Sequence, residues 1–174
     1  TITWSTLRAG DEVVLFEPYY FPWHASLRQR GINVKFVPLA EDGSLDAKAL
    51  DQAITSNTKM LVFDNPSLAD GNVIQPSELQ QIANIVSKHK DLIVVSNESL
   101  HKQTIDYSTH QSFASLPGMF ERTLTLFSGG MEFDCRGFRM GWIIGPADYI
   151  IHQGTYQSYT IYSTQTPGMV NYSF

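Results

Sequence analysis

The hydrophobic residues of the chain are concentrated in short runs that are separated by polar and turn-forming segments. Short apolar runs rich in β-branched residues are typical of buried strands rather than helices. The predicted buried strands cover Glu12–Phe16, Lys59–Phe63, Leu92–Val95, Thr123–Phe127 and Trp142–Ile144. Polar and apolar residues alternate over residues 33–37, which indicates a half-buried or edge strand.

Between these runs, the spacing of apolar residues predicts helices. The clearest helix begins at Gln75, where Pro76 suits the first helical position and Glu78 suits the positive end of the helix dipole. Its apolar stripe consists of Leu79, Ile82, Ile85 and Val86. Further helices are predicted over Trp23–Arg30, around Leu50 and Ile54 with Ser44 or Asp46 as the cap, and from Pro146 towards Gln157. Two segments are predicted to be loops, Glu17–Pro22 with its two prolines and Asp64–Val73 with its turn formers.

Strands that alternate with helices predict an α/β three-layer sandwich with a mostly parallel sheet. With 174 residues and 43% hydrophobic content, the chain is long enough for one core, so we expect one domain. Residues Thr1–Leu7 have the pattern of the tail of a helix that ends at Gly10, and Phe174 lies inside another apolar segment. We therefore expect the domain to be incomplete at both ends of this sequence.

Charge and composition argue against several classes of partner. The 12 Lys and Arg residues against 17 Asp and Glu give a net charge of −5, and the basic residues are scattered. Nucleic acid is therefore not expected as a partner, because phosphate binding depends on clustered positive charge. No apolar run reaches membrane-spanning length, and the single cysteine, Cys135, excludes an internal disulfide.

Several motifs follow one another in the order seen in a known enzyme family. They are Gly10–Val14 followed by Glu17–Tyr20, then Ala114–Thr125, Gly141–Pro146 and Ser163–Gln165. The first resembles class I aminotransferases, which use pyridoxal phosphate (PLP), and the others resemble the branch of kynurenine aminotransferases and cysteine-conjugate β-lyases. The resemblance implies the PLP-transferase large domain, of which residues 1–174 would form a part without the N-terminal arm or the C-terminal small domain.

The resemblance also implies a role for individual positions, and four of them carry an unexpected residue. Met131 takes the place of the lysine that binds PLP, in the run Ser128–Met131. Asn97 takes the place of the aspartate that pairs with the pyridine nitrogen. Leu68 and Leu100 take the places of an asparagine and a tyrosine that bond the ring hydroxyl. Methionine has no nucleophilic nitrogen, so we expect no covalently held cofactor and no turnover.

Three positions match the family pattern. By resemblance, Tyr20 is the aromatic residue that stacks on the ring, Ser128 contributes the phosphate hydroxyl, and Arg139 contributes the phosphate cation. Weak, noncovalent PLP binding is compatible with these three residues.

The leading hypothesis is a catalytically inactive aminotransferase-like protein that serves as a structural or accessory subunit of a larger assembly, or as a homodimer, in the mitochondrion or cytoplasm. One alternative is an active aminotransferase or cysteine-conjugate β-lyase of kynurenine aminotransferase type, for which Lys102 is the one candidate replacement lysine. A second alternative is a noncatalytic module that binds a phosphate-bearing ligand through Ser128 and Arg139.

Other reactive side chains show no catalytic pattern in the sequence. The five histidines have no metal-ligand spacing, so no metal site is predicted. Cys135 lacks the sequence context of a thiol protease, and neither Glu98 nor Asp106 forms a recognisable acid–base pair.

Overall fold

The computed structural model describes residues 1–104 and 110–162, and within these ranges six strands form one sheet in the order β2-β1-β3-β4-β5-β6. The strands are β1 (Glu12–Glu17), β2 (Asn33–Pro38), β3 (Thr58–Asp64), β4 (Ile93–Asn97), β5 (Thr123–Ser128) and β6 (Gly141–Ile144). The first five run parallel, and β6 pairs with β5 in the antiparallel direction. The prediction of a mostly parallel sheet is confirmed.

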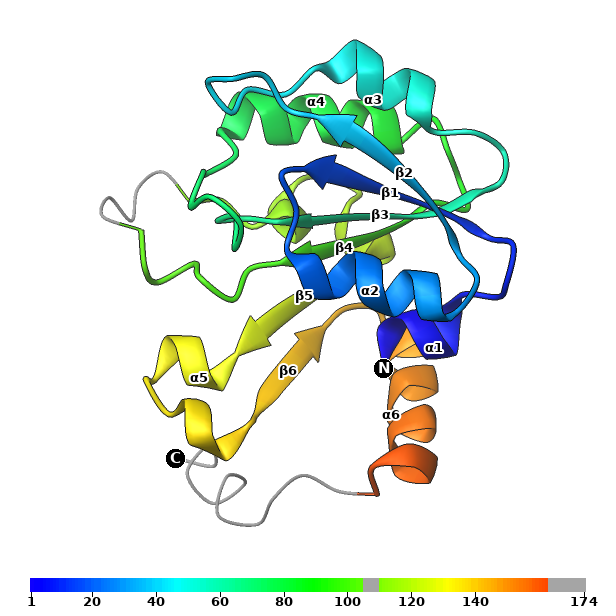
Figure 1. Cartoon of the computed structure of the whole chain (residues 1–174), viewed down its shortest axis with the longest axis vertical. Helices are drawn as coiled ribbons and strands as arrows, with labels where there is room; N and C mark the ends of the chain where they lie inside the picture. The colour runs from blue at the N-terminus through cyan, green and yellow to red at the C-terminus, as the bar shows by residue number, and fades with distance from the viewer. Residues whose placement is uncertain (105–109, 163–174) are drawn as a thin grey trace.

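Helices cover both faces of this sheet (Figure 1). The helices are α1 (Ile2–Thr6), α2 (Phe21–Gln29), α3 (Ala47–Ala53), α4 (Pro76–Val86), α5 (Gly129–Glu132) and α6 (Ala147–Thr160). Short 3₁₀ turns are formed by η1 (Phe113–Ser115), η2 (Phe120–Arg122) and η3 (Arg136–Phe138). Helices α3 and α4 lie on one side of the sheet, and α1, α2 and α6 lie on the other (Figure 1). This arrangement confirms the predicted three-layer sandwich.

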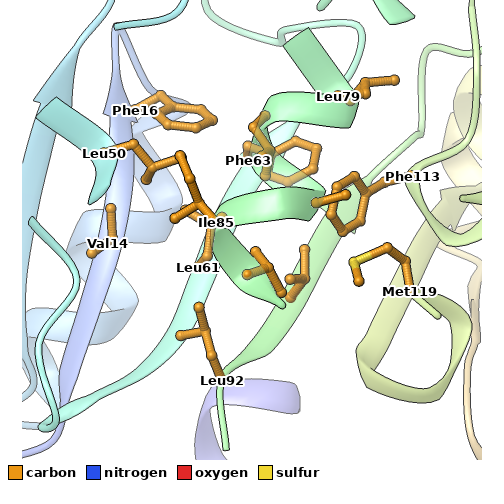
Figure 2. Packing of buried hydrophobic residues seen from close by; sticks show 14 of the residues in the cluster. Val14, Phe16, Leu50, Leu61, Phe63, Leu79, Ile85, Leu92, Phe113 and Met119 are labelled. Carbon is orange, nitrogen blue, oxygen red and sulfur yellow. The ribbon is translucent and has the colours of Figure 1, made fainter. Parts of the chain in front are cut away.

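The core on the α3–α4 side is built around aromatic residues (Figure 2). Phe63 from β3 lies edge-on to Phe113 from η1, with ring centroids 5.4 Å apart and planes at 87°. Leu79 from α4 and Met119 belong to the same cluster and are fully buried. Because the alternate residues of β1, β3 and β4 contribute to a second core under α1 and α2, these strands are apolar on both faces.

The cluster on the other face joins the sheet to α1, α2 and α6. Val62, Val95 and Leu124 come from three neighbouring strands, and Leu27 comes from α2. Partly buried aromatic residues, among them Trp23, pack against this cluster. Because side chains alternate between the faces of a strand, the residues two positions after Val62 and Val95 lie on the face that α2 covers.

Local boundaries differ from the prediction at several points. Helix α2 begins at Phe21, two residues earlier than expected, because Pro22 fits the first turn of a helix, where its missing N–H loses no bond. Helix α3 is capped by Asp46, whose Oδ1 accepts from the N–H of Ala49 at 2.9 Å, and not by Ser44. Strand β3 includes Asp64, which was predicted to start the following loop.

Two predicted features lie outside the described residues, namely Asp106 and the motif Ser163–Gln165. Among the helices in the described ranges, none is both long and apolar enough to cross a membrane.

Candidate functional site

The carboxyl ends of three parallel strands bring the candidate site residues to one edge of the sheet. Asp64 at the end of β3 lies in register with Asn97 at the end of β4, and Asn97 lies in register with Leu126 of β5. Strand β5 then ends at Ser128, where α5 begins. Open α/β sheets bind ligands at this edge, so the predicted positions converge where a site is expected.

Asn97 is hydrogen-bonded to a carboxylate that the sequence reasoning did not single out. Its Nδ2 donates to Oδ1 of Asp64 at 2.7 Å, and Nε1 of Trp23 donates to the same oxygen at 3.0 Å. Its own Oδ1 accepts from the hydroxyl of Ser99 at 2.6 Å. Asn97 is 5% exposed. Both ends of its buried amide are hydrogen-bonded, the nitrogen to Asp64 and the oxygen to Ser99. The charged partner of Asn97 is therefore Asp64.

Burial raises the pKa of the Asp64 carboxyl above its ordinary value of 3.8, and the hydrogen bonds from Trp23 and Asn97 offset part of this rise. Within the described parts of the chain, Asp64 forms no ion pair with a cationic side chain. A carboxylate that is partly buried with neutral donors alone is a costly arrangement, and such groups concentrate at functional sites.

Ser128, Met131 and Arg139 line one cavity of about 210 Å³ together with Gly130, Arg136 and Met140. Ser128 caps α5, since its hydroxyl accepts from the N–H of Met131 at 3.4 Å. Gly130 permits the close approach of η3, because a Cβ at this position would lie 2.9 Å from the Cα of Arg136. The structure thus groups the predicted phosphate-binding residues around the methionine.

Tyr20 lies apart from that cavity. It is 41% exposed and lines a different pocket, of about 320 Å³, with Trp23, Leu126 and Ile143 among the other lining residues. Leu68 lies in the turn that follows β3 and Leu100 in the turn that follows β4, and both are partly buried.

The segment after β4 also contacts α5. Lys102 forms an ion pair with Glu132, the residue after Met131, and Gln103 Nε2 donates to the carbonyl of Met131 at 2.8 Å. The ammonium of Lys102 also lies 5.3 Å from the ring centroid of Phe133. The side chain of Lys102 is 50% exposed, so its ammonium is held at the surface of α5.

Glu98, for which the sequence showed no recognisable acid–base pair, is buried and hydrogen-bonded. Its side chain is 1% exposed, and its Oε1 accepts from Ser96, Ser112 and the backbone N–H of Phe113. Nε2 of His110 lies 3.8 Å from its other oxygen. Burial raises the pKa of Glu98 and lowers the pKa of His110. These groups point to the α3–α4 side of the sheet, away from Asp64, and serve the packing of η1.

No group of three or more His, Cys, Asp and Glu side chains in the described ranges is arranged to hold a metal ion.

Comparison with known proteins identifies the family. Residues 1–173 match the family model described as aminotransferase class I and II. The chain belongs to this aminotransferase family. It is 35% identical to a kynurenine–oxoglutarate transaminase of Dictyostelium discoideum, over 94% of this chain and 41% of that protein.

Solved structures of aminotransferases have the same fold. An N-succinyldiaminopimelate aminotransferase of Mycobacterium tuberculosis superimposes with a TM-score of 0.90 at 32% identity, over 95% of this chain and 44% of the other. An aspartate aminotransferase of Thermus thermophilus superimposes with a TM-score of 0.89 at 27% identity, over 95% and 43%. The chain spans about two fifths of the length of these relatives.

The residues present do not fit covalently held PLP. Met131 provides a thioether where the family resemblance requires an amine, and the nearby ammonium of Lys102 is paired with Glu132. Leu68 and Leu100 carry no polar side-chain atoms at the positions where the resemblance places residues that bond the ring hydroxyl. Ser128 and Arg139 line one cavity, whereas Asp64 and Asn97 are hydrogen-bonded to each other outside the lining of that cavity.

The sequence pattern around Asp64 resembles that around Asn97. Asp64 and Asn97 each follow a buried apolar run, and the carboxyl ends of neighbouring parallel strands meet at the same edge. Trp23 could not be found in this way, because its contact with Asp64 spans 41 positions and depends on how α2 packs.

Replacing Asp64 by asparagine is expected to stabilise the folded protein at neutral pH. Because the native pKa of Asp64 is raised, the native state retains this proton at pH values where the unfolded chain has lost it, so wild-type stability falls as pH rises through that window. Asparagine does not titrate, and its oxygen can still accept from Trp23 and Asn97. Urea unfolding should therefore show a higher free energy of unfolding for Asp64→Asn than for the wild type. This difference should be absent below pH 3.8, grow with rising pH, and exceed about 0.5 kcal/mol at pH 7.

The matched control for this prediction is Asp91→Asn, which changes an exposed aspartate. Its effect should stay within about 0.5 kcal/mol at every pH. A gain for Asp64→Asn that does not depend on pH would contradict the assignment of Asp64 as a carboxylate strained by burial.

Proposed function

We propose that this chain is part of an aminotransferase-family protein that does not catalyse transamination and serves instead as an accessory subunit. The observation that supports the proposal is Met131, which lines the cavity with Ser128 and Arg139 where the family resemblance requires a lysine. Imine formation needs a nucleophilic amine, and a thioether cannot supply one.

The change at Asn97 supports the same proposal. A neutral amide can bond a pyridine nitrogen but cannot balance its positive charge, so the ring would withdraw electrons less strongly. The loss of a hydrogen bond to a charged group costs about 1.5–3 kcal/mol, and Leu68 and Leu100 lie at two further altered positions. Changes at several cofactor-binding positions together favour a site that no longer catalyses a reaction over a site with one tolerated substitution.

The second candidate is an active PLP-dependent aminotransferase or cysteine-conjugate β-lyase of kynurenine aminotransferase type. The relatives are named as transaminases or aminotransferases, and these names support an active enzyme more directly than an accessory role. Within the chain, the favouring observation is Lys102, which reaches α5 and pairs with Glu132 beside Met131. This candidate requires Lys102 to leave that ion pair and act as the amine.

The third candidate is a noncatalytic module that binds a phosphate-bearing ligand. Ser128, Arg136 and Arg139 lie around one cavity of about 210 Å³, and Arg139 has a left-handed backbone with φ of 52°. A non-glycine residue rarely adopts this conformation without a local reason. Two guanidinium groups near a serine hydroxyl would suit a phosphate.

We further propose that residues 1–174 form part of a large domain that is completed by segments outside this sequence. A homodimer or a larger protein assembly would provide the partner surface, and the mitochondrion or the cytoplasm would be its location.

Covalent attachment of PLP separates the first two candidates. The full-length protein is mixed with stoichiometric PLP and reduced with borohydride, and the modified peptide is mapped by mass spectrometry. We expect no modified residue in the segment 97–140 of the wild type and a modified lysine at position 131 in Met131→Lys. The control is Met140→Lys, which places an amine in the same cavity at a position without a family role and should remain unmodified.

A wild-type adduct on Lys102, abolished in Lys102→Met together with transamination of kynurenine, would overturn the accessory role in favour of the active enzyme. Turnover in Lys102→Met would contradict both assignments.

A further inference from the structure

Helix α5 is held only weakly by its own interactions. It is four residues long, and two of these residues are glycines. Short helices are marginal in water, and glycine disfavours the helical state because it loses more conformational freedom than other residues. The capping hydroxyl of Ser128 lies 3.4 Å from the backbone nitrogen of Met131, which is longer than a typical hydrogen bond. The position of α5 therefore depends on contacts with other segments of the chain.

Two adjacent residues in the segment after β4 provide such contacts. Lys102 forms an ion pair with Glu132, and Gln103 Nε2 donates to the carbonyl of Met131 at 2.8 Å. The ammonium of Lys102 also lies 5.3 Å from the ring centroid of Phe133, within the range of a cation–π interaction. These contacts join the segment after β4 to the C-terminal half of α5 and to the residue that follows the helix.

The two members of the ion pair differ in their exposure to solvent. The side chain of Glu132 is 9% exposed, whereas the side chain of Lys102 is 50% exposed. Oε2 of Glu132 is buried and has no hydrogen-bond partner among the described residues. Over the same residues, Lys102 is the one cationic side chain paired with Glu132. The buried carboxylate therefore depends on a cation that solvent and reagents can reach.

This asymmetry makes the ion pair sensitive to the charge of Lys102. Loss of that charge would leave the carboxylate of Glu132 unpaired in a buried site, which is strongly unfavourable. Movement of α5 would relieve the cost by bringing Glu132 into water, and a short helix with few contacts of its own can move without unfolding the sheet. The ion pair of Lys88 and Asp51 differs in this respect, because both side chains are well exposed and water can replace either partner.

We propose that Lys102 and Glu132 form a charge latch. While Lys102 is charged, the latch holds α5, and with it Met131, against the segment after β4. Neutralisation of the Lys102 amine releases α5, so that Glu132 becomes solvated. The proposal goes beyond the accessory function and does not rest on it, since the latch needs neither a cofactor nor turnover.

Hydrogen exchange of the full-length protein at pH 7, without added ligand, tests the latch. Mass spectrometry follows the peptide that contains residues 128–133. In Lys102→Gln, the amides of this peptide should exchange at least about tenfold faster than in the wild type, because α5 opens more often. In Lys102→Gln/Glu132→Gln, exchange should return to within about threefold of the wild type, because no buried charge remains unpaired.

Two single variants serve as controls. Lys102→Arg keeps the positive charge, and its peptide 128–133 should exchange within about threefold of the wild-type rate. Lys88→Gln breaks the exposed ion pair with Asp51 and is the matched control. It should leave exchange in residues 128–133 unchanged.

The reactivity of Lys102 gives a second readout that does not depend on the folding of Lys102→Gln. Acetylation by N-hydroxysuccinimidyl acetate requires the amine to leave its ion pair and lose a proton. Lys102 should therefore react at least about fivefold more slowly in the wild type than in Glu132→Gln, because the carboxylate stabilises the charged ammonium. Lys88 should react at the same rate in both proteins.

Unchanged exchange of residues 128–133 in Lys102→Gln would overturn the proposal. Exchange in the double variant as fast as in Lys102→Gln would also overturn it, since the effect would then come from lost contacts and not from the buried charge. Equal acetylation rates of Lys102 in the wild type and Glu132→Gln would do the same. All of these measurements are made without a cofactor, so a failure here is distinguishable from a failure of the accessory function.

Discussion

Replacement of Phe113 by alanine is expected to lower the free energy of unfolding by about 3–5 kcal/mol, which is the usual range for a buried phenylalanine. Phe113 is fully buried and packs edge-to-face against Phe63, with ring centroids 5.4 Å apart. Figure 2 shows its ring between Phe63 and Met119, at the junction of β3, α4 and the segment before β5. Removal of the ring would leave a cavity that three separate elements would have to close.

The matched control is Phe120→Ala, because Phe120 is 46% exposed and lies in the next 3₁₀ turn. This substitution should lower the free energy of unfolding by less than about 1 kcal/mol. Urea unfolding of both variants measures the difference, and the slope of each transition shows whether two-state behaviour persists. Similar losses in the two variants would mean that η1 is not part of the cooperative core.

The sheet could be predicted because both of its faces are covered. Strands such as β4 must be apolar at consecutive positions when helices pack on each side, and this leaves a pattern that a sequence displays. The direction of β6 leaves no such pattern, since a short apolar run has the same composition whether it runs parallel or antiparallel. Glycine at position 141 marks the pairing, because a Cβ there would lie 2.6 Å from the carbonyl oxygen of Phe127.

The candidate site could be predicted in part for a similar reason. The resemblance to the aminotransferase family indicated Ser128 and Arg139, and the structure places both around one cavity with Met131. Asp64 was assigned to a loop although it follows a buried apolar run, and its hydrogen bond to Asn97 depends on the register between two separate strands. Contacts across parallel strands depend on register, and register is set by the packing of the whole sheet.

Asp64 and Glu98 are carboxylates at the ends of adjacent strands, and they differ in the number of hydrogen bonds that their oxygens accept. Oε1 of Glu98 accepts three hydrogen bonds, whereas Oδ2 of Asp64 accepts none from the described residues. A fully bonded buried group contributes to a specific fold, and a partly bonded one retains capacity for a ligand. The two residues should therefore respond differently to substitution.

Replacement of Glu98 by alanine is expected to lower the free energy of unfolding by about 3 kcal/mol or more. The change removes one oxygen that accepts from Ser96 at 3.0 Å, from Ser112 at 2.9 Å and from the N–H of Phe113 at 3.1 Å. Buried donors left without an acceptor cost about 1–3 kcal/mol each, and water can reach few of them because Glu98 is 1% exposed. The segment that holds Phe113 over the core would lose its attachment to β4.

Glu98→Gln separates the role of this oxygen from the role of the charge. Glutamine keeps an acceptor at Oε1, so it should unfold with a free energy at least about 2 kcal/mol above that of Glu98→Ala. Because burial raises the pKa of Glu98 above 4.5, wild-type stability falls as pH rises through the window between the unfolded and native pKa values. Glutamine does not titrate and removes this dependence.

His110 faces Glu98, with His101 beside it, and contributes a pH dependence of the opposite sign. Burial lowers the pKa of His110, so stability falls as pH drops below 6.5 in the wild type and in Glu98→Gln alike. Unfolding of the wild type and both variants from pH 4 to 8 measures the difference, and a glutamine variant as unstable as the alanine variant would show that the charge facing His110 fixes this segment.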